Sequence, residues 1–173
     1  AAADPVIARE LESVFAATAA EIEARGPACW ASGRCCNFEK TGHRLYVTGL
    51  EAAYAIERLS SERSITPEDV ARAVTDGGCP FQAANLCGIH AIKPLGCRVY
   101  FCDRSAQEWQ QELSERMLAR IRALHERFDV PYRYAEWREL LAAVLGFLPR
   151  GTATTGGSTS GSDVPHAAAV TVS

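Results

Sequence analysis

Residues 76–104 read DGGCPFQAANLCGIHAIKPLGCRVYFCDR and hold four of the seven cysteines of the chain. Turn-forming residues are spread through this segment, and Pro80 and Pro94 exclude a continuous helix. A second segment, PACWASGRCCNFEKTGH at residues 27–43, holds the other three cysteines and shows no apolar periodicity. We therefore expect two irregular loops that carry every cysteine of the protein.

Helical patterns flank both loops. Asp4-Pro5 predicts the start of a helix over residues 5–25. Its apolar face comprises Leu11, Val14, Phe15, Ala19 and Ile22. Capping boxes predict three further helix starts, at Thr48 with Glu51, Thr66 with Asp69, and Ser105 with Glu108. The third of these opens the longest helix, with a face of Trp109, Leu113, Met117, Ile121, Leu124 and Phe128.

Two weaker patterns complete the predicted fold. Residues 45–48 favour a short strand, and residues 134–146 favour a last helix that buries Trp137 among leucines. We expect a mainly α protein, in which residues 1–150 form one small helical domain and the two cysteine loops converge on a metal site. Residues 151–173 are rich in Gly, Ser and Thr, so we expect a disordered tail there.

Composition restricts the class of protein. The chain has 173 residues, 47% of them hydrophobic, which suits one globular domain. Its 18 Lys and Arg against 21 Asp and Glu give a net charge of -3, which argues against a nucleic-acid partner. The sequence has no apolar run of spanning length and no signal-like start, so we expect a cytoplasmic protein without membrane contact. In that reducing compartment, clustered thiols more often bind metal than form disulfides.

The cysteine spacing limits the kind of metal site. It reads Cys29-x5-Cys35-Cys36 in the first loop and Cys79-x7-Cys87-x9-Cys97-x4-Cys102 in the second. No C-x2-C pair is present, which argues against a standard zinc finger. The adjacent pair Cys35-Cys36 is awkward for one small ion but suits two metals or two irons of one cluster. An iron–sulfur cluster or iron fits this pattern, and zinc is the alternative.

The cysteine segments resemble the YkgJ-type cysteine-cluster family, which is described as a zinc- or iron-chelating domain with a CxxCxxCC signature. The matching residues of the second loop are Cys79-Pro80-Phe81, Cys87-Gly88-Ile89-His90, Lys93-Pro94 and Cys97-Arg98, followed by Tyr100 and Cys102. The resemblance implies a ligand role for the four cysteines of this loop. Two departures occur: Ser32 stands at a cysteine position of the signature, and Lys93 stands where arginine is usual.

Other side chains are weaker candidates for the site. His90 lies between two cysteines of the second loop and could complete a metal site through its imidazole, and His43 is a lesser candidate. Arg98 follows Cys97 and could donate to a thiolate or bind an anionic cofactor at the metal. We expect His125 and His166 to be solvated. The chain contains no nucleotide-binding or hydrolase motif that would identify a catalytic residue.

Three functions remain open at this stage. The first is a small protein that holds iron or an iron–sulfur cluster and transfers electrons or senses oxidants. The second is a structural zinc module that presents its helices to a protein partner. The third is a metal-dependent enzyme, for which the only lead is a distant relationship of the family to flagellin lysine N-methylases.

Overall fold

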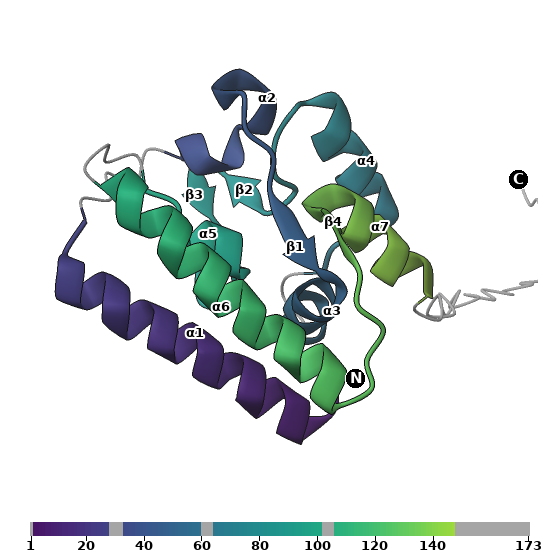
Figure 1. The fold of residues 1–173 in the computed structure, drawn as a ribbon. Helices are drawn as coiled ribbons and strands as arrows, with labels where there is room; N and C mark the ends of the chain where they lie inside the picture. Colours follow the sequence, from purple (N-terminus) through teal and green to yellow (C-terminus); the bar gives the residue numbers. More distant parts are fainter. Residues whose placement is uncertain (1, 28–32, 60–63, 102–105, 148–173) are drawn as a thin grey trace, which may run out of the picture.

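The structure is a computed structural model that describes residues 2–27, 33–59, 64–101 and 106–147 (Figure 1). Its elements are α1 (Pro5–Arg25), η1 (Arg34–Cys36), α2 (Phe38–Thr41), β1 (Tyr46–Thr48), α3 (Gly49–Glu57), α4 (Pro67–Thr75), β2 (Gln82–Ala83), β3 (Leu86–Cys87), α5 (Leu95–Val99), α6 (Gln107–Arg127), β4 (Tyr134–Glu136) and α7 (Trp137–Phe147). The protein is mainly helical, which confirms the predicted fold class. The predicted tail, with His166, lies outside the described residues, and so do Cys29, Ser32 and Cys102.

Capping residues set the ends of α1. Asp4 accepts a hydrogen bond from the backbone N–H of Val6 at 2.8 Å, and Gly26 ends the helix in the left-handed conformation with φ 58°. Leu11, Val14 and Phe15 are buried as predicted, but Ala19 is exposed and Ile22 is only partly buried. Ile7, Ala8 and Thr18 are buried as well. The Thr18 hydroxyl donates to the Val14 carbonyl at 2.8 Å, so its burial leaves no unpaired donor.

Two of the three predicted capping boxes are present in the described residues. They open α3 at Thr48 and α4 at Thr66. The third predicted box depends on Ser105, which lies outside the described residues. Ala106, the residue before α6, has the helical angles φ -83° and ψ -13°.

Residues 134–136 form a strand and not the first turn of the last helix. Strand β4 pairs antiparallel with β1, with Tyr46 opposite Glu136 and Thr48 opposite Tyr134. This pairing satisfies backbone groups of β1 that would otherwise lack partners. Helix α7 consequently begins at Trp137, and the Trp137 N–H donates to the Leu45 carbonyl at 2.8 Å.

Two buried clusters hold the described residues together. In the first, α1 and α6 run antiparallel side by side and pack with α3 and α5 (Figure 1). Its residues include Leu11, Phe15, Leu113, Met117 and Ile121. In the second, α7 packs against α3 and α4. The residues of that cluster include Phe38, Val47, Trp137, Leu140 and Leu141, and the partly buried Cys79, Cys87 and Cys97 pack against it.

His125 lies in the last turn of α6 and is buried, with 2% exposure, so the prediction of a solvated side chain is wrong. Its Nδ1 lies 3.2 Å from the carbonyl oxygens of both Val130 and Pro131. The imidazole thus pairs with the chain that turns back after the helix, which explains its burial. No described helix combines the length and the apolar character that crossing a bilayer requires.

Candidate metal centre

Backbone hydrogen bonds join the two cysteine segments. The Cys79 N–H donates to the Cys36 carbonyl at 2.8 Å, and the Glu39 N–H donates to the Gly77 carbonyl at 2.9 Å. These bonds pair residues that are about 40 positions apart in the sequence. They hold the start of the second cysteine segment directly against the η1 turn that carries Cys35 and Cys36.

Gly33 allows a second close approach between these segments. Its φ of 69° is left-handed, and a Cβ at this position would lie 2.6 Å from the Asn85 carbonyl oxygen. The Gly33 carbonyl also accepts a hydrogen bond from Gln82 Nε2 at 3.0 Å. Only glycine fits this position, because any side chain would separate η1 from the β2–β3 hairpin. The hairpin carries Cys87, so Gly33 sets the distance between Cys87 and the first segment.

The thiol of Cys36 lies at the centre of a group of cysteines. It is 7% exposed, and the thiols of Cys35, Cys79 and Cys87 lie close enough to compete for its proton, which raises the Cys36 pKa. Cys97 lies close enough to this group for the thiolate forms of Cys79 and Cys87 to raise its pKa. The structure therefore brings together five of the seven candidate cysteines. Cys29 and Cys102 lie outside the described residues.

These contacts distribute the protons unevenly among the thiols. The hydrogen bond with Cys36 lowers the pKa of Cys35 to about 6, and the same contact raises the pKa of Cys36. Cys36 also lowers the pKa of Cys79, with smaller contributions from the Phe81 backbone N–H and the Trp137 side chain. Removal from water raises the pKa of Cys97. Negative charge is thus favoured on Cys35 and Cys79, on either side of the Cys36 proton.

The thiols contact one another without adopting the arrangement of metal ligands. Within the described residues, no group of three or more His, Cys, Asp or Glu side chains is placed to hold one metal ion. Hydrogen-bonded thiols share protons, whereas metal ligands lose them and surround an ion at about 2.3 Å for zinc. Ligation would therefore require these thiols to lose their protons and to rearrange around the ion.

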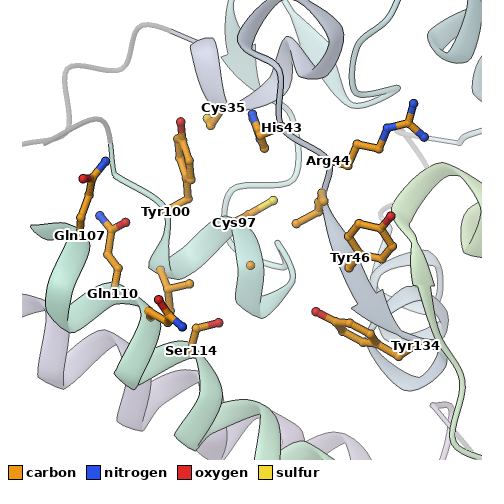
Figure 2. Close-up of a pocket in the computed structure, with 14 residues that line it drawn as sticks. Cys35, His43, Arg44, Tyr46, Cys97, Tyr100, Gln107, Gln110, Ser114 and Tyr134 are labelled. Atoms are coloured by element: carbon orange, nitrogen blue, oxygen red, sulfur yellow. The ribbon is translucent and has the colours of Figure 1, made fainter. Parts of the chain in front are cut away.

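Two cavities reach the thiols from different sides. Cys35 and Cys97 line both of them. The first, of about 330 Å³, has glutamines of α6 on one side and Tyr46 and Tyr134 on the other (Figure 2). The second, of about 350 Å³, is lined by Cys36, Cys87, His90 and Lys93, among others. A small molecule of the size of these cavities could therefore approach the cysteines.

The two histidine candidates occupy different cavities. His90 is exposed, and its Nε2 lies 3.1 Å from Lys93 Nζ, a cation that lowers the histidine pKa. His43 lies in the first cavity, stacks on Tyr100 with ring centroids 4.9 Å apart, and has its Nδ1 2.7 Å from the Thr41 hydroxyl. Burial lowers the pKa of His43. Each histidine therefore has one ring nitrogen occupied by a neighbouring side chain.

Arg98 makes its close contacts with α1 and the second cysteine segment. Its guanidinium lies over the Phe15 ring at 4.2 Å, and its Nη2 donates to the Ala91 carbonyl at 2.9 Å. Burial lowers the Arg98 pKa, with the charges of Tyr54 and Cys97 acting in the opposite direction. Arg98 is absent from the linings of both cavities, so the structure places this predicted cofactor-binding residue beside the thiol group and not within it.

Glu51 positions the helix that carries Cys97. This carboxylate is 2% exposed, and its Oε1 accepts a hydrogen bond from the Leu95 N–H at 2.8 Å, at the start of α5. Its Oε2 accepts from the Thr48 N–H at 2.8 Å, at the start of α3. One side chain thus caps two helices. The sequence indicates the Thr48 contact through the capping box but gives no sign of the contact with Leu95.

Comparison of the chain with protein-family models, with curated proteins and with solved structures finds no match. The resemblance to the YkgJ-type family consequently stays a prediction. The functional argument therefore depends on the geometry of the cysteines.

Proposed function

We propose that the protein binds iron, as an iron–sulfur cluster or as iron alone, through clustered cysteine thiolates. The observation that carries this proposal is the contact of Cys36 with the thiols of Cys35, Cys79 and Cys87. Four sulfur donors in one place form a soft ligand set, which suits iron–sulfur clusters and zinc and is poorly suited to magnesium or calcium.

The position of these thiols strengthens the argument against ordinary core cysteines. Cys35, Cys79, Cys87 and Cys97 are only half-buried, and cavities reach two of them from two sides. Cysteines that act as small apolar residues are usually buried completely. Partial exposure leaves a route for a metal to enter and for the released protons to leave.

Iron is favoured over zinc by the adjacent pair Cys35-Cys36. Both thiols belong to the group, and each shifts the pKa of the other. A cluster with more than one iron can accept both sulfurs on different iron atoms. A structural zinc site remains the alternative, and metal analysis separates the two.

An enzymatic role has one observation in its favour. The first cavity brings about 330 Å³ of space to Cys35 and Cys97, so a ligand of modest size could reach a metal held there (Figure 2). Catalytic metals keep a position open for water or substrate, whereas structural metals are closed by protein ligands. The described residues identify no substrate.

The test is metal and acid-labile sulfide analysis of the full chain purified without oxygen, with a visible spectrum. Iron with sulfide and a visible absorption supports a cluster, and iron without sulfide supports iron alone. A colourless protein with stoichiometric zinc supports the zinc module, because zinc has a filled d shell. Protein that binds neither metal, with all seven thiols open to titration in the folded state, would overturn the proposal.

Serine variants locate the ligands within the chain. Cys97→Ser should lose more metal and more thermal stability than Cys29→Ser, because the part of the family resemblance that includes Cys97 is the more complete one. Removal of a true ligand also removes binding energy that contributes to folding. Equal losses in the two variants would contradict this assignment.

A further inference from the structure

The first cavity has two walls of different chemistry (Figure 2). One wall is a face of α6 that carries Gln107, Gln110 and Ser114. The opposite wall is formed by Tyr46 of β1 and Tyr134 of β4, whose rings stack with centroids 5.9 Å apart. The volume of about 330 Å³ lies at the lower end of the range for small-molecule sites. A small ligand seated there would meet hydrogen-bonding groups on one side and aromatic rings on the other.

The wall on α6 is an uncharged stripe on a highly charged helix. The residues of this stripe, which we call the α6 stripe, recur at steps of three or four positions and therefore share one face: Gln107, Gln110, Gln111 and Ser114. The other exposed residues between positions 107 and 116 are all charged, namely Glu108, Glu112, Glu115 and Arg116. Charge is thus missing from α6 only where the helix faces the cavity. Amides and hydroxyls both donate and accept hydrogen bonds, so the stripe suits a ligand that does the same.

Much of the hydrogen-bonding capacity of the cavity is unused. The side chains of Gln107 and Ser114 make no hydrogen bond within the described part of the chain, and neither do the hydroxyls of Tyr46, Tyr100 and Tyr134. All five side chains are at least partly exposed, so water solvates these groups in the free protein. A ligand that reproduces the hydrogen bonds of this water can replace it at little cost.

The two walls offer no counter-ion to a charged ligand. Neither Asp nor Glu is among the described residues that line the cavity, and Arg44 is their only permanent cation. The Arg44 guanidinium lies 3.9 Å from Glu39 and points away from α6 (Figure 2). A charged ligand would therefore lose water at the walls without gaining an ion pair there. The lining favours an uncharged ligand that is rich in hydrogen-bonding groups.

We propose that the first cavity binds a neutral sugar. The C–H face of a pyranose ring lies on Tyr46 and Tyr134, because aromatic rings present a flat apolar surface. The hydroxyls around the ring bond to the α6 stripe. A planar heterocycle fits less well, because its polar groups lie in one plane, whereas the stripe extends over about 10 Å of helix from Gln107 to Ser114. This proposal goes beyond the proposed function and does not require a bound metal.

The test is saturation-transfer NMR on the unaltered full chain with the methyl α-pyranosides of glucose, galactose and mannose. Methyl glycosides have no free aldehyde, so they cannot react with the thiols of the protein. Irradiation of the aromatic protons of the protein should transfer saturation to the ring C–H protons of at least one glycoside, and titration gives its Kd. Glucuronate, a sugar with a negative charge, and nicotinamide, a neutral planar heterocycle, should both bind more weakly.

Matched variants locate the site. Tyr46→Ala removes one ring of the aromatic wall and should raise the Kd roughly tenfold. Gln107→Ala removes one hydrogen bond to the ligand and should raise it about fivefold. Tyr132→Ala removes a tyrosine that is likewise exposed but lies outside the lining of the cavity, and should leave the Kd unchanged. If Tyr46→Ala does not fold, Gln107→Ala still decides, because it alters only an exposed side chain.

The outcomes separate this proposal from the metal proposal. Absence of saturation transfer to all three glycosides would overturn the sugar site and leave metal binding untouched. Tighter binding of glucuronate or nicotinamide would also overturn it, because the lining would then select a different class of ligand. An unchanged Kd in both Tyr46→Ala and Gln107→Ala would place the sugar outside this cavity, which again overturns the proposal. Glycoside binding by a chain that holds no metal would support the sugar site alone.

Discussion

Two regions of the molecule are ordered by different forces. One is the pair of helices α1 and α6, and the other is the cysteine region, which is formed by residues 33–36 and 79–97. The helix pair buries continuous apolar faces, with Leu11 and Ile121 at 0% exposure. The cysteine region has few fully buried apolar side chains and is joined by a few backbone hydrogen bonds and by contacts among thiols. Apolar packing is independent of bound ligands, whereas thiol contacts change when protons are exchanged for metal.

This difference determines where a bound metal would act on stability. A ligand that binds only the folded state stabilises it by an amount that depends on its concentration and affinity. The residues that would gain order from a bound metal are those of the cysteine region, because the helix pair is already packed. Substitutions in the helix pair should therefore change stability alone, and substitutions in the cysteine region should change stability and metal affinity together.

The largest effect is expected from Ile121→Ala in the helix pair. This change removes a fully buried side chain and should lower the free energy of unfolding by about 4 kcal/mol. Urea unfolding measures the loss, and the exposed Ala119→Ser on the same helix is the control, with a change below about 0.5 kcal/mol. Metal bound per folded molecule should stay the same in both variants. A loss of metal from folded Ile121→Ala would break the distinction between the regions.

Glu51 should show the next largest effect, because it links the helix core to the helix that carries Cys97. Glu51→Ala leaves the N–H groups of Thr48 and Leu95 buried without an acceptor and should cost about 3 kcal/mol. The matched control is Asp69→Ala, which removes the exposed capping box of α4 and should cost about 1 kcal/mol. Equal losses in urea unfolding would show that the second contact of Glu51 contributes nothing.

The same two carboxylates should respond to pH in opposite directions. Burial raises the pKa of Glu51, so its contribution to stability is present below the ordinary glutamate pKa and is lost as pH rises through the raised value. Hydrogen bonds from Thr66 lower the pKa of Asp69, so its contribution is present above the ordinary aspartate pKa and is lost as pH falls through the lowered value. The measurement is the free energy of unfolding across pH. The stability of the unaltered chain relative to Glu51→Gln should fall as pH rises, and its stability relative to Asp69→Asn should rise.

A further prediction compares two glycines with the same backbone conformation. Gly33 and Gly42 both have φ 69°, but a Cβ at Gly33 would meet the Asn85 carbonyl at 2.6 Å, and a Cβ at Gly42 would meet nothing within 4 Å. Gly42→Ala should cost about 1 kcal/mol for the left-handed conformation alone. Gly33→Ala should cost about 2 to 3 kcal/mol, because the hairpin must also move.

Metal affinity distinguishes the two glycine variants further. Gly33→Ala separates η1 from the hairpin that carries Cys87 and should weaken metal binding, whereas Gly42→Ala should not. Thermal unfolding and a competition assay against a chelator measure the two quantities. Equal metal affinity in both variants would mean that the approach of Gly33 to Asn85 does not set the spacing of the thiols.

Features that depend on neighbouring residues could be predicted from the sequence. The apolar face of α1, its ends at Asp4 and Gly26, and the capping boxes at Thr48 and Thr66 all follow from residues within one or two helical turns.

Features that depend on distant residues could not be predicted. The pairing of β1 with β4 joins residues about 90 positions apart, and three residues are too few for a periodic signal. The cysteine spacing predicted that the thiols would be grouped, but not that Cys36 would lie at the centre of the group.

The smallest effect is expected at His90, which lies on the edge of the cysteine region. Its Nε2 is 3.1 Å from the Lys93 ammonium, whose charge is the main cause of the lowered pKa of this histidine. The imidazole is therefore neutral near pH 7, and the lone pair of Nε2 already accepts from Lys93. His90→Gln retains an acceptor for Lys93 and should change the metal Kd by less than about threefold, or about 0.7 kcal/mol.

Two comparison variants make this small effect informative. Cys87→Ser, in the same cavity, should weaken binding far more, because it removes a sulfur that contacts Cys36. Lys93→Met removes the hydrogen-bond partner of His90 Nε2. If the freed imidazole can reach the metal, the metal Kd of this variant should fall. If His90→Gln weakened metal binding tenfold or more, the result would instead show that Nε2 of His90 gives up its hydrogen bond with Lys93 and binds the metal. The cysteine region would then be ordered by a mixed sulfur and nitrogen ligand set, which favours zinc over an all-thiolate iron–sulfur cluster.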